Sequence, residues 1–240
     1  MTILLCIFIP AVFYGSFPVQ EPYLEIVGFS EDGCHLAYTL TGEYEGSAFP
    51  YCEIYILDLE TGDVTETFFG VDETQSISCS LLMDNLITSH EEDFTEYGIA
   101  FGDHGVLLEF PPLDSPPDAE IVSFIVHGDV VGFPEGLYSL DLFQITTDSL
   151  TEYYEMNPSF CVLNLTRAEN SISSNLLDSS ISPLIEYTVY RYRQNGFLLH
   201  PSGYFVVFIA CTVEGFEIPE TVIIPLVFSF TSNDGTCELM

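Results

Sequence analysis

The sequence lacks lysine altogether, and its only basic side chains are Arg167, Arg191 and Arg193. These three face 37 acidic residues in a chain of 240, which gives a formal net charge of -34. Proteins bind nucleic acids by neutralising phosphates with lysine and arginine. The composition therefore argues against nucleic-acid binding and against an anionic lipid surface. The acidic composition instead fits a solvated acidic surface, or the binding of a divalent cation or a basic partner.

Charged residues are also scarce, at 17% of the chain against about 25% in ordinary domains. The imbalance thus comes mainly from missing cations, so a salt-adapted acidic shell explains it poorly. Self-repulsion predicts that stability rises when salt is added.

The familiar catalytic and metal-binding motifs are missing too. The chain has no Gly-x-Ser-x-Gly elbow, no paired-histidine motif, no Cys-x-x-Cys, no phosphate loop and no dinucleotide fingerprint. The segment from Asp58 to Asp63 comes closest to a calcium loop, but it lacks the alternating acidic register and is interpreted as an ordinary β-turn. His127 and His200 are interpreted as satisfied histidines at strand ends. The sequence therefore predicts no catalytic residue, no metal ligand and no cofactor.

The N-terminus carries an apolar run from Ile3 to Tyr14, broken only by Pro10 and followed by Gly15 and Ser16. This is typical of a signal-peptide core, and it is too short to span a bilayer, which takes about 20 apolar residues. We predict a signal peptide at residues 1–16, a secreted or periplasmic location and no stable membrane insertion. The alternative is a buried N-terminal strand.

Seven cysteines are present, one of which, Cys6, lies within the expected signal peptide. The remaining six permit fifteen disulfide pairings in an oxidising compartment, and the sequence does not choose among them. Buried reduced thiols that pack as small hydrophobic side chains are the alternative.

Abundant apolar residues predict a folded, mostly β chain. Hydrophobic residues make up 48% of the sequence, with 20 Phe and 14 Tyr, which rules out disorder for most of its length. Alternation of apolar and polar residues, punctuated by glycine turns, predicts antiparallel sheets in a propeller-like or sandwich arrangement, within one β-rich domain at residues 17–240.

Two segments depart from this alternation. Apolar spacings of three to five predict one amphipathic helix near residues 74–97, with Asp72 or Thr74 as its N-cap and Gly98 just past its end. The serine-rich stretch 171–182 is interpreted as a mobile connection.

Two strand-turn-strand units, near 24–64 and 196–230, echo each other. Gly33 corresponds to Gly203, and each unit then has an apolar strand and a loop containing Glu-Gly, Phe and Pro. This repetition favours related blade-like units.

The first unit, through Gly28 to Gly33, Gly46 to Tyr51 and Ile54 to Leu59, resembles the opening signature of an uncharacterised bacterial family of predicted secreted proteins. Residues 215–220 are similar to the closing signature of that family. The chain departs from the pattern where the family commonly has basic residues, at Cys34, Thr221 and Val222. The resemblance implies export and β architecture but no activity. The first unit also looks like the repeat of periplasmic propeller proteins, which is an analogy of fold alone.

The loops 41–50 and 213–220 are the best candidates for a functional surface, because loops that carry aromatic and acidic residues suit recognition. We expect this surface to be lined by Glu45, Phe49, Tyr51, Glu214, Phe216 and Glu217. The alternative is that Phe49 and Phe216 fill the core beneath their loops. The leading hypothesis is a non-enzymatic exported domain that binds a protein or a cell-envelope component. The second is an acidic-residue hydrolase or a divalent-metal-dependent enzyme. The sequence does not predict an oligomeric state.

Overall fold

The computed structural model describes part of the chain in detail. The described residues are 22–44, 47–103, 105–109, 119–126, 130, 134–147, 158–167, 172–179, 189–213, 220–230 and 237–239. The expected signal peptide at residues 1–16 lies outside them.

The first sheet is an antiparallel meander in the order β1-β2-β3-β4. Its strands are β1 (Tyr23–Phe29), β2 (His35–Glu43), β3 (Pro50–Asp58) and β4 (Val64–Val71). Gly33 and Gly62 occupy the turns after β1 and β3 with φ of 72° and 76°, a conformation that glycine adopts without a steric cost.

The middle sheet has the order β13-β12-β11-β10-β5. Its strands are β5 (Val106–Glu109), β10 (Val189–Leu199), β11 (Tyr204–Val213), β12 (Glu220–Phe230) and β13 (Cys237–Leu239). Pro225 lies in β12 opposite Phe208. The paired residues of β13 lie opposite Phe228 to Phe230 only, so Pro225 lies where β12 has no described neighbour on its other side, as is typical of proline within sheets.

The third sheet is a second meander, in the order β6-β7-β8-β9. Its strands are β6 (Ala119–Val126), β7 (Gly136–Thr146), β8 (Ser159–Arg167) and β9 (Ile172–Asp178). Strand β9 corrects the prediction of a mobile connection at residues 171–182 for residues 172–179, the part of this stretch that the structure describes. Backbone pairing with β8 holds this segment in the sheet, and Ser179, just after the strand, accepts a 2.7 Å hydrogen bond from the Cys161 amide.

Two helices, α1 (Cys79–Ser89) and α2 (Glu91–Glu96), replace the single helix expected near 74–97. His90 lies between them with φ −116° and ψ 22°, outside helical geometry. The N-cap is Ser78, which accepts from the Leu81 amide, and is neither Asp72 nor Thr74. Gly98 follows α2 with φ 65°, as predicted for a residue that ends a helix. Neither helix in the described part of the chain is long and apolar enough to cross a membrane.

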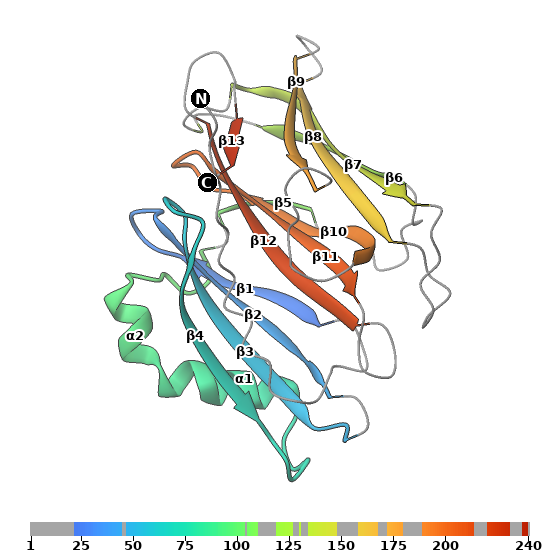
Figure 1. Cartoon of the computed structure of the whole chain (residues 1–240). Helices are drawn as coiled ribbons and strands as arrows, with labels where there is room; N and C mark the ends of the chain where they lie inside the picture. The colour runs from blue at the N-terminus through green and yellow to red at the C-terminus, as the bar shows by residue number, and fades with distance from the viewer. Residues whose placement is uncertain are drawn as a thin grey trace.

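These elements form four stacked layers (Figure 1). The helices cover one face of the first sheet through a cluster that includes Ile54, Leu82 and Phe94. The opposite face of that sheet packs on the middle sheet, through residues such as Tyr38 and Phe208. Helices thus close one end of the stack, and the β6–β9 sheet forms the other end.

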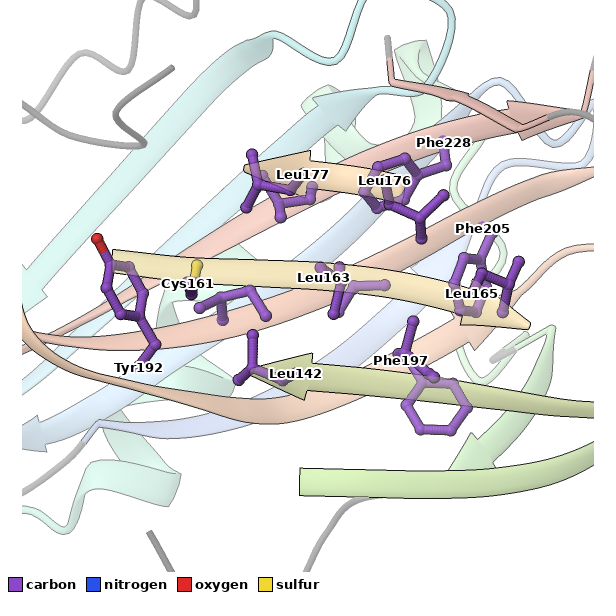
Figure 2. Packing of buried hydrophobic residues seen from close by; sticks show 14 of the residues in the cluster. Leu142, Cys161, Leu163, Leu165, Leu176, Leu177, Tyr192, Phe197, Phe205 and Phe228 are labelled. Atoms are coloured by element: carbon purple, nitrogen blue, oxygen red, sulfur yellow. The ribbon is translucent and has the colours of Figure 1, made fainter. Parts of the chain in front are cut away.

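The largest hydrophobic cluster joins the middle sheet to the third sheet. Leu142 and Leu163 of the third sheet pack toward Phe197 and Phe205 of the middle sheet, as Figure 2 shows. Successive β11 residues therefore serve different cores: Phe205 and Val207 face the third sheet, whereas Val206 and Phe208 face the first. This explains why β11 is a nearly continuous apolar run, as a strand buried on both faces requires.

The prediction of a mostly β chain with antiparallel sheets is confirmed. The sheets stack face to face, and the described residues contain no closed barrel or propeller. The sequence patterns indicated no strand at the positions of β4, β9 and β13.

Candidate functional site

The strongest candidate site lies on the first sheet, where polar and aromatic side chains share one face of β3. Tyr51, Glu53 and Tyr55 occupy alternate positions of this strand, so they point to the same side of the sheet. That side is the one that faces the middle sheet, since Leu57 at the next alternate position packs there. With Tyr38 and Tyr44 these three residues form what we call the tyrosine–glutamate cluster.

Glu53 is the charged centre of the cluster. The Tyr55 hydroxyl donates a 2.8 Å hydrogen bond to Glu53 Oε2. Burial raises the pKa of Glu53, and this hydrogen bond only partly opposes the rise. Glu53 forms no ion pair with any described residue; the ion pair between His90 and Asp93 lies on the helices. The Glu53 carboxylate therefore has no cationic partner within the described structure.

Tyrosine rings surround this carboxylate in two stacked pairs. Tyr44 and Tyr51 stack with ring centroids 4.8 Å apart, and Tyr38 and Tyr55 stack at 5.1 Å. Gly42 makes room for the first pair: it lies opposite Tyr51, and a Cβ there would be 2.8 Å from a Tyr51 ring carbon. Any larger residue at position 42 would displace the Tyr51 ring.

The tyrosine hydroxyls remain protonated at neutral pH. Burial, followed by the nearby Glu53 charge, raises the pKa of Tyr44 to about 12. The same two causes raise the pKa values of Tyr38, Tyr51 and Tyr55 well above the usual range for tyrosine. The cluster thus offers neutral rings, hydroxyls and one carboxylate, and the rings favour cations over anions.

One side of the cluster is anchored and the other side is open. Tyr38 packs edge-on against Phe208 of the middle sheet at 5.1 Å, which fixes the inner side. On the other side of β3, Glu53 pairs with Phe69 of β4, whose side chain is 42% exposed, and Tyr55 pairs with the exposed Thr67. A ligand can therefore approach Glu53 along β4.

The connections beside the cluster hold strained backbone. Ala48 in the β2–β3 loop and Gln75 in the β4–α1 loop have φ of 52° and 53°, the only non-glycine residues with positive φ in the described part of the chain. The Gln75 side-chain amide donates a 2.6 Å hydrogen bond to the Ser47 carbonyl oxygen, which ties these two loops together. Such strain persists where surrounding structure enforces it, and it concentrates at functional sites.

Of the residues predicted to line a binding surface, two can be placed. Tyr51 is buried in the cluster, with 3% of its surface exposed, and Phe49 is half-buried at the end of the neighbouring loop. Phe49 belongs to none of the three core clusters, so the described structure does not assign it to the core beneath the loop. The other predicted positions, Glu45, Glu214, Phe216 and Glu217, lie outside the described residues.

The flanks of the two predicted loops lie at the same end of the stack. The turns at Gly33 and at Ser202 touch, with the Ser202 hydroxyl donating to the Gly33 carbonyl oxygen at 3.4 Å. Strands β2 and β11 start at these turns and run side by side into one core. Their far ends, Glu43 and Val213, are thus brought to the same end of the fold (Figure 1).

The His200 side chain stabilises this pair of turns. Its Nδ1 lies 2.7 Å from the Ser202 hydroxyl, and its ring packs on Phe29 with centroids 4.6 Å apart. Burial lowers the pKa of His200, against opposing effects of two aspartates. These contacts agree with the prediction of a satisfied histidine at a strand end, since His200 directly follows β10.

The described residues contain no group of three or more His, Cys, Asp or Glu side chains that could hold a metal ion. Five cysteines whose side chains the structure describes, Cys34, Cys52, Cys79, Cys161 and Cys211, are free thiols. Cys6 and the side chain of Cys237 lie outside the described part of the chain.

Sequence reasoning missed four of the five cluster residues as site residues: Tyr38, Tyr44, Glu53 and Tyr55. A signal was present, because a glutamate stands between two tyrosines at alternate positions of an otherwise apolar strand. Tyr44 and Tyr38 join the site only through strand pairing, which the sequence does not display.

No protein-family model matches the chain, and no curated protein matches it. The resemblance to a bacterial family of secreted proteins therefore stays a prediction.

Proposed function

We propose that the chain is a non-enzymatic, exported binding domain that recognises a cationic protein segment through the tyrosine–glutamate cluster and the adjoining β2–β3 loop. The observation that carries this proposal is Glu53, a half-buried carboxylate among tyrosine rings whose pKa is raised by burial. An approaching cation would stabilise this charge, which burial keeps from being fully solvated by water.

The composition supports a partner that supplies the cation. The three arginines lie on β8 and β10, and Glu53 forms no ion pair with any of them, so a counter-charge for Glu53 has to come from another molecule. The net charge of -34 would also speed the approach of a basic partner.

Arginine fits the cluster better than lysine. A guanidinium group can stack on a tyrosine ring while its planar fork donates to a carboxylate, whereas an ammonium group is a compact and strongly hydrated charge. The proposed partner is accordingly an arginine-containing segment of a protein or of the cell envelope. We further propose that the units near 24–64 and 196–230 are related blade-like units, which the similar turns at Gly33 and Gly203 support.

Calorimetric titration with an oligoarginine peptide and with an oligolysine peptide of equal length tests the proposal. We expect Glu53→Gln to weaken oligoarginine binding by about 10-fold or more, since a hydrogen bond to a charged group contributes roughly 1.5–3 kcal/mol. Tyr55→Phe, which removes the hydroxyl bonded to Glu53, should weaken it less.

The control is Glu31→Gln, which removes the same charge from an exposed residue of the β1–β2 turn. If Glu31→Gln and Glu53→Gln weaken binding equally, the peptide responds only to net charge and the proposed site is wrong. Equal affinity of the wild-type protein for the two peptides would contradict the preference for arginine.

A further inference from the structure

The outward face of the third sheet carries large apolar side chains that no described element covers, with polar residues such as Ser139, Asp141 and Asn164 between them. Six large hydrophobic side chains on β6, β7 and β8 are each at least 37% exposed, whereas alternate residues of the same strands are buried against the middle sheet. The exposed residues are Ile121, Ile125, Leu137, Phe143, Ile145 and Phe160. The first sheet has no such face, because its helices cover it (Figure 1).

We infer that this face is the interface of a symmetric dimer, in which the third sheets of two copies of the chain stack face to face. The inference is independent of the proposed cationic ligand, whose site lies on the first sheet.

The first argument for a second copy is the pairing of β7 with β8. On the outward face, Ile145 pairs with Phe160, Phe143 with Val162, and Asp141 with Asn164. A twofold axis parallel to these strands and between them would place β7 of one copy over β8 of the other. Each residue would then face a copy of its own pairing partner. Apolar side chains would meet apolar ones, and each Asp141 carboxylate would meet an Asn164 amide.

The second argument is the size of the face. Four strands about 4.8 Å apart and some nine residues long, at about 3.3 Å per residue, present roughly 600 Å² in projection. Protruding side chains make the accessible area larger than this projected area. The area that each copy could bury therefore approaches the ~800 Å² per partner of a standard stable interface. A small molecule would leave most of such a face exposed.

Charge sets the condition under which the dimer forms. Each chain carries a net charge of -34, so two copies repel each other at low ionic strength. On the face itself Asp141 accepts a hydrogen bond from Ser139, and in the twofold arrangement the two Asp141 carboxylates do not oppose each other. Added salt screens the long-range repulsion and leaves the apolar contact in place. Dimerisation should therefore strengthen as salt is added.

Sedimentation equilibrium of the full chain tests the inference at about 0.02 M and about 0.5 M sodium chloride, where screening lengths differ several-fold. We expect a reversible dimer that is tighter at the higher salt. Phe143→Asp should weaken it on the order of 10³-fold, because each dimer loses two central apolar contacts. Leu81→Asp is the control: Leu81 is 46% exposed on α1 and the change in charge is the same, so its dimer should match the wild type.

Ile145→Thr serves as a second variant that keeps a β-branched residue in the strand and adds no charge. It should weaken the dimer while circular dichroism and the urea midpoint stay close to the wild type. A chain that is monomeric at both salt concentrations overturns the inference. So does a dimer that Phe143→Asp leaves intact, or one that Leu81→Asp disrupts equally. If the chain is instead a monomer that binds neutral detergent micelles through this face, the face has a different occupant and the inference of a dimer is also overturned.

Discussion

Truncation of Phe208 tests whether the layers form one cooperative core that also supports the tyrosine–glutamate cluster. Phe208 lies in the middle sheet with none of its surface exposed, and its ring packs against Tyr38 at 5.1 Å. Phe208→Ala removes buried apolar surface and leaves a cavity between two sheets that cannot easily collapse. Such truncations cost about 3–5 kcal/mol.

This loss is a large fraction of the total stability of a typical domain, which is about 5–15 kcal/mol. Urea unfolding followed by circular dichroism measures it. With an m-value of roughly 2–3 kcal/mol/M, the midpoint should fall by about 1–2.5 M. The same variant should also weaken oligoarginine binding, because Tyr38 would lose the contact that holds its stack with Tyr55.

Phe101→Ala is the matched control, since Phe101 is 54% exposed beside α2. Its truncation should cost less than about 1 kcal/mol. A loss below about 1.5 kcal/mol for Phe208→Ala with an unchanged m-value would refute the packing of the first sheet on the middle sheet. A loss no greater than that of Phe101→Ala would refute it as well.

Three further predictions concern the charge, the thiols and the turns. Burial raises the pKa of Glu53, so the ionised side chain costs stability above its folded pKa, and this cost disappears below the unfolded value of about 4.3. Glu53→Gln should therefore raise the urea midpoint at pH 7 and have little effect near pH 4; the reverse order would contradict the burial. Burial also raises the pKa of the Cys161 thiol to about 12. Iodoacetamide should therefore label the partly exposed Cys34 before Cys161, as measured by peptide mapping. Faster labelling of Cys161 would be inconsistent with its place in the core. Gly98→Ala, at φ 65° in open space, should lower the free energy of unfolding by about 1–2 kcal/mol. Gly33→Ala should lower it more, because its Cβ would lie 2.4 Å from a His200 ring atom. Equal losses in urea unfolding would argue against contact between the turns at Gly33 and Ser202.

The β architecture was predictable because alternation records burial directly. In β7, for example, buried Leu140 and Leu142 alternate with the outward Asp141 and Phe143. Strand β9 escaped prediction because its stability comes from backbone pairing with β8, and a serine-rich composition gives no sign of that. The helix break at His90 escaped because apolar spacing runs on across it.

The candidate site was predictable only in part, because its residues meet across strands. The loop beside Tyr51 was identified from its composition, and Tyr51 does belong to the cluster. The sequence did not reveal that Glu53 would be half-buried or that Tyr38 and Tyr55 would stack, since both depend on the register of β2 with β3 and on coverage by the middle sheet.

Carboxyl-detected NMR titration of Glu53, with and without an oligoarginine peptide of about six residues, tests the central claim most directly. The account predicts a raised pKa for Glu53 in the free protein and a lower pKa when the peptide is bound, because a nearby cation favours the carboxylate. By linkage, peptide affinity should fall as the pH drops through the Glu53 pKa. An ordinary pKa in the free protein, or a raised one that the peptide leaves unchanged, would contradict the assignment of Glu53 as the cation-binding residue.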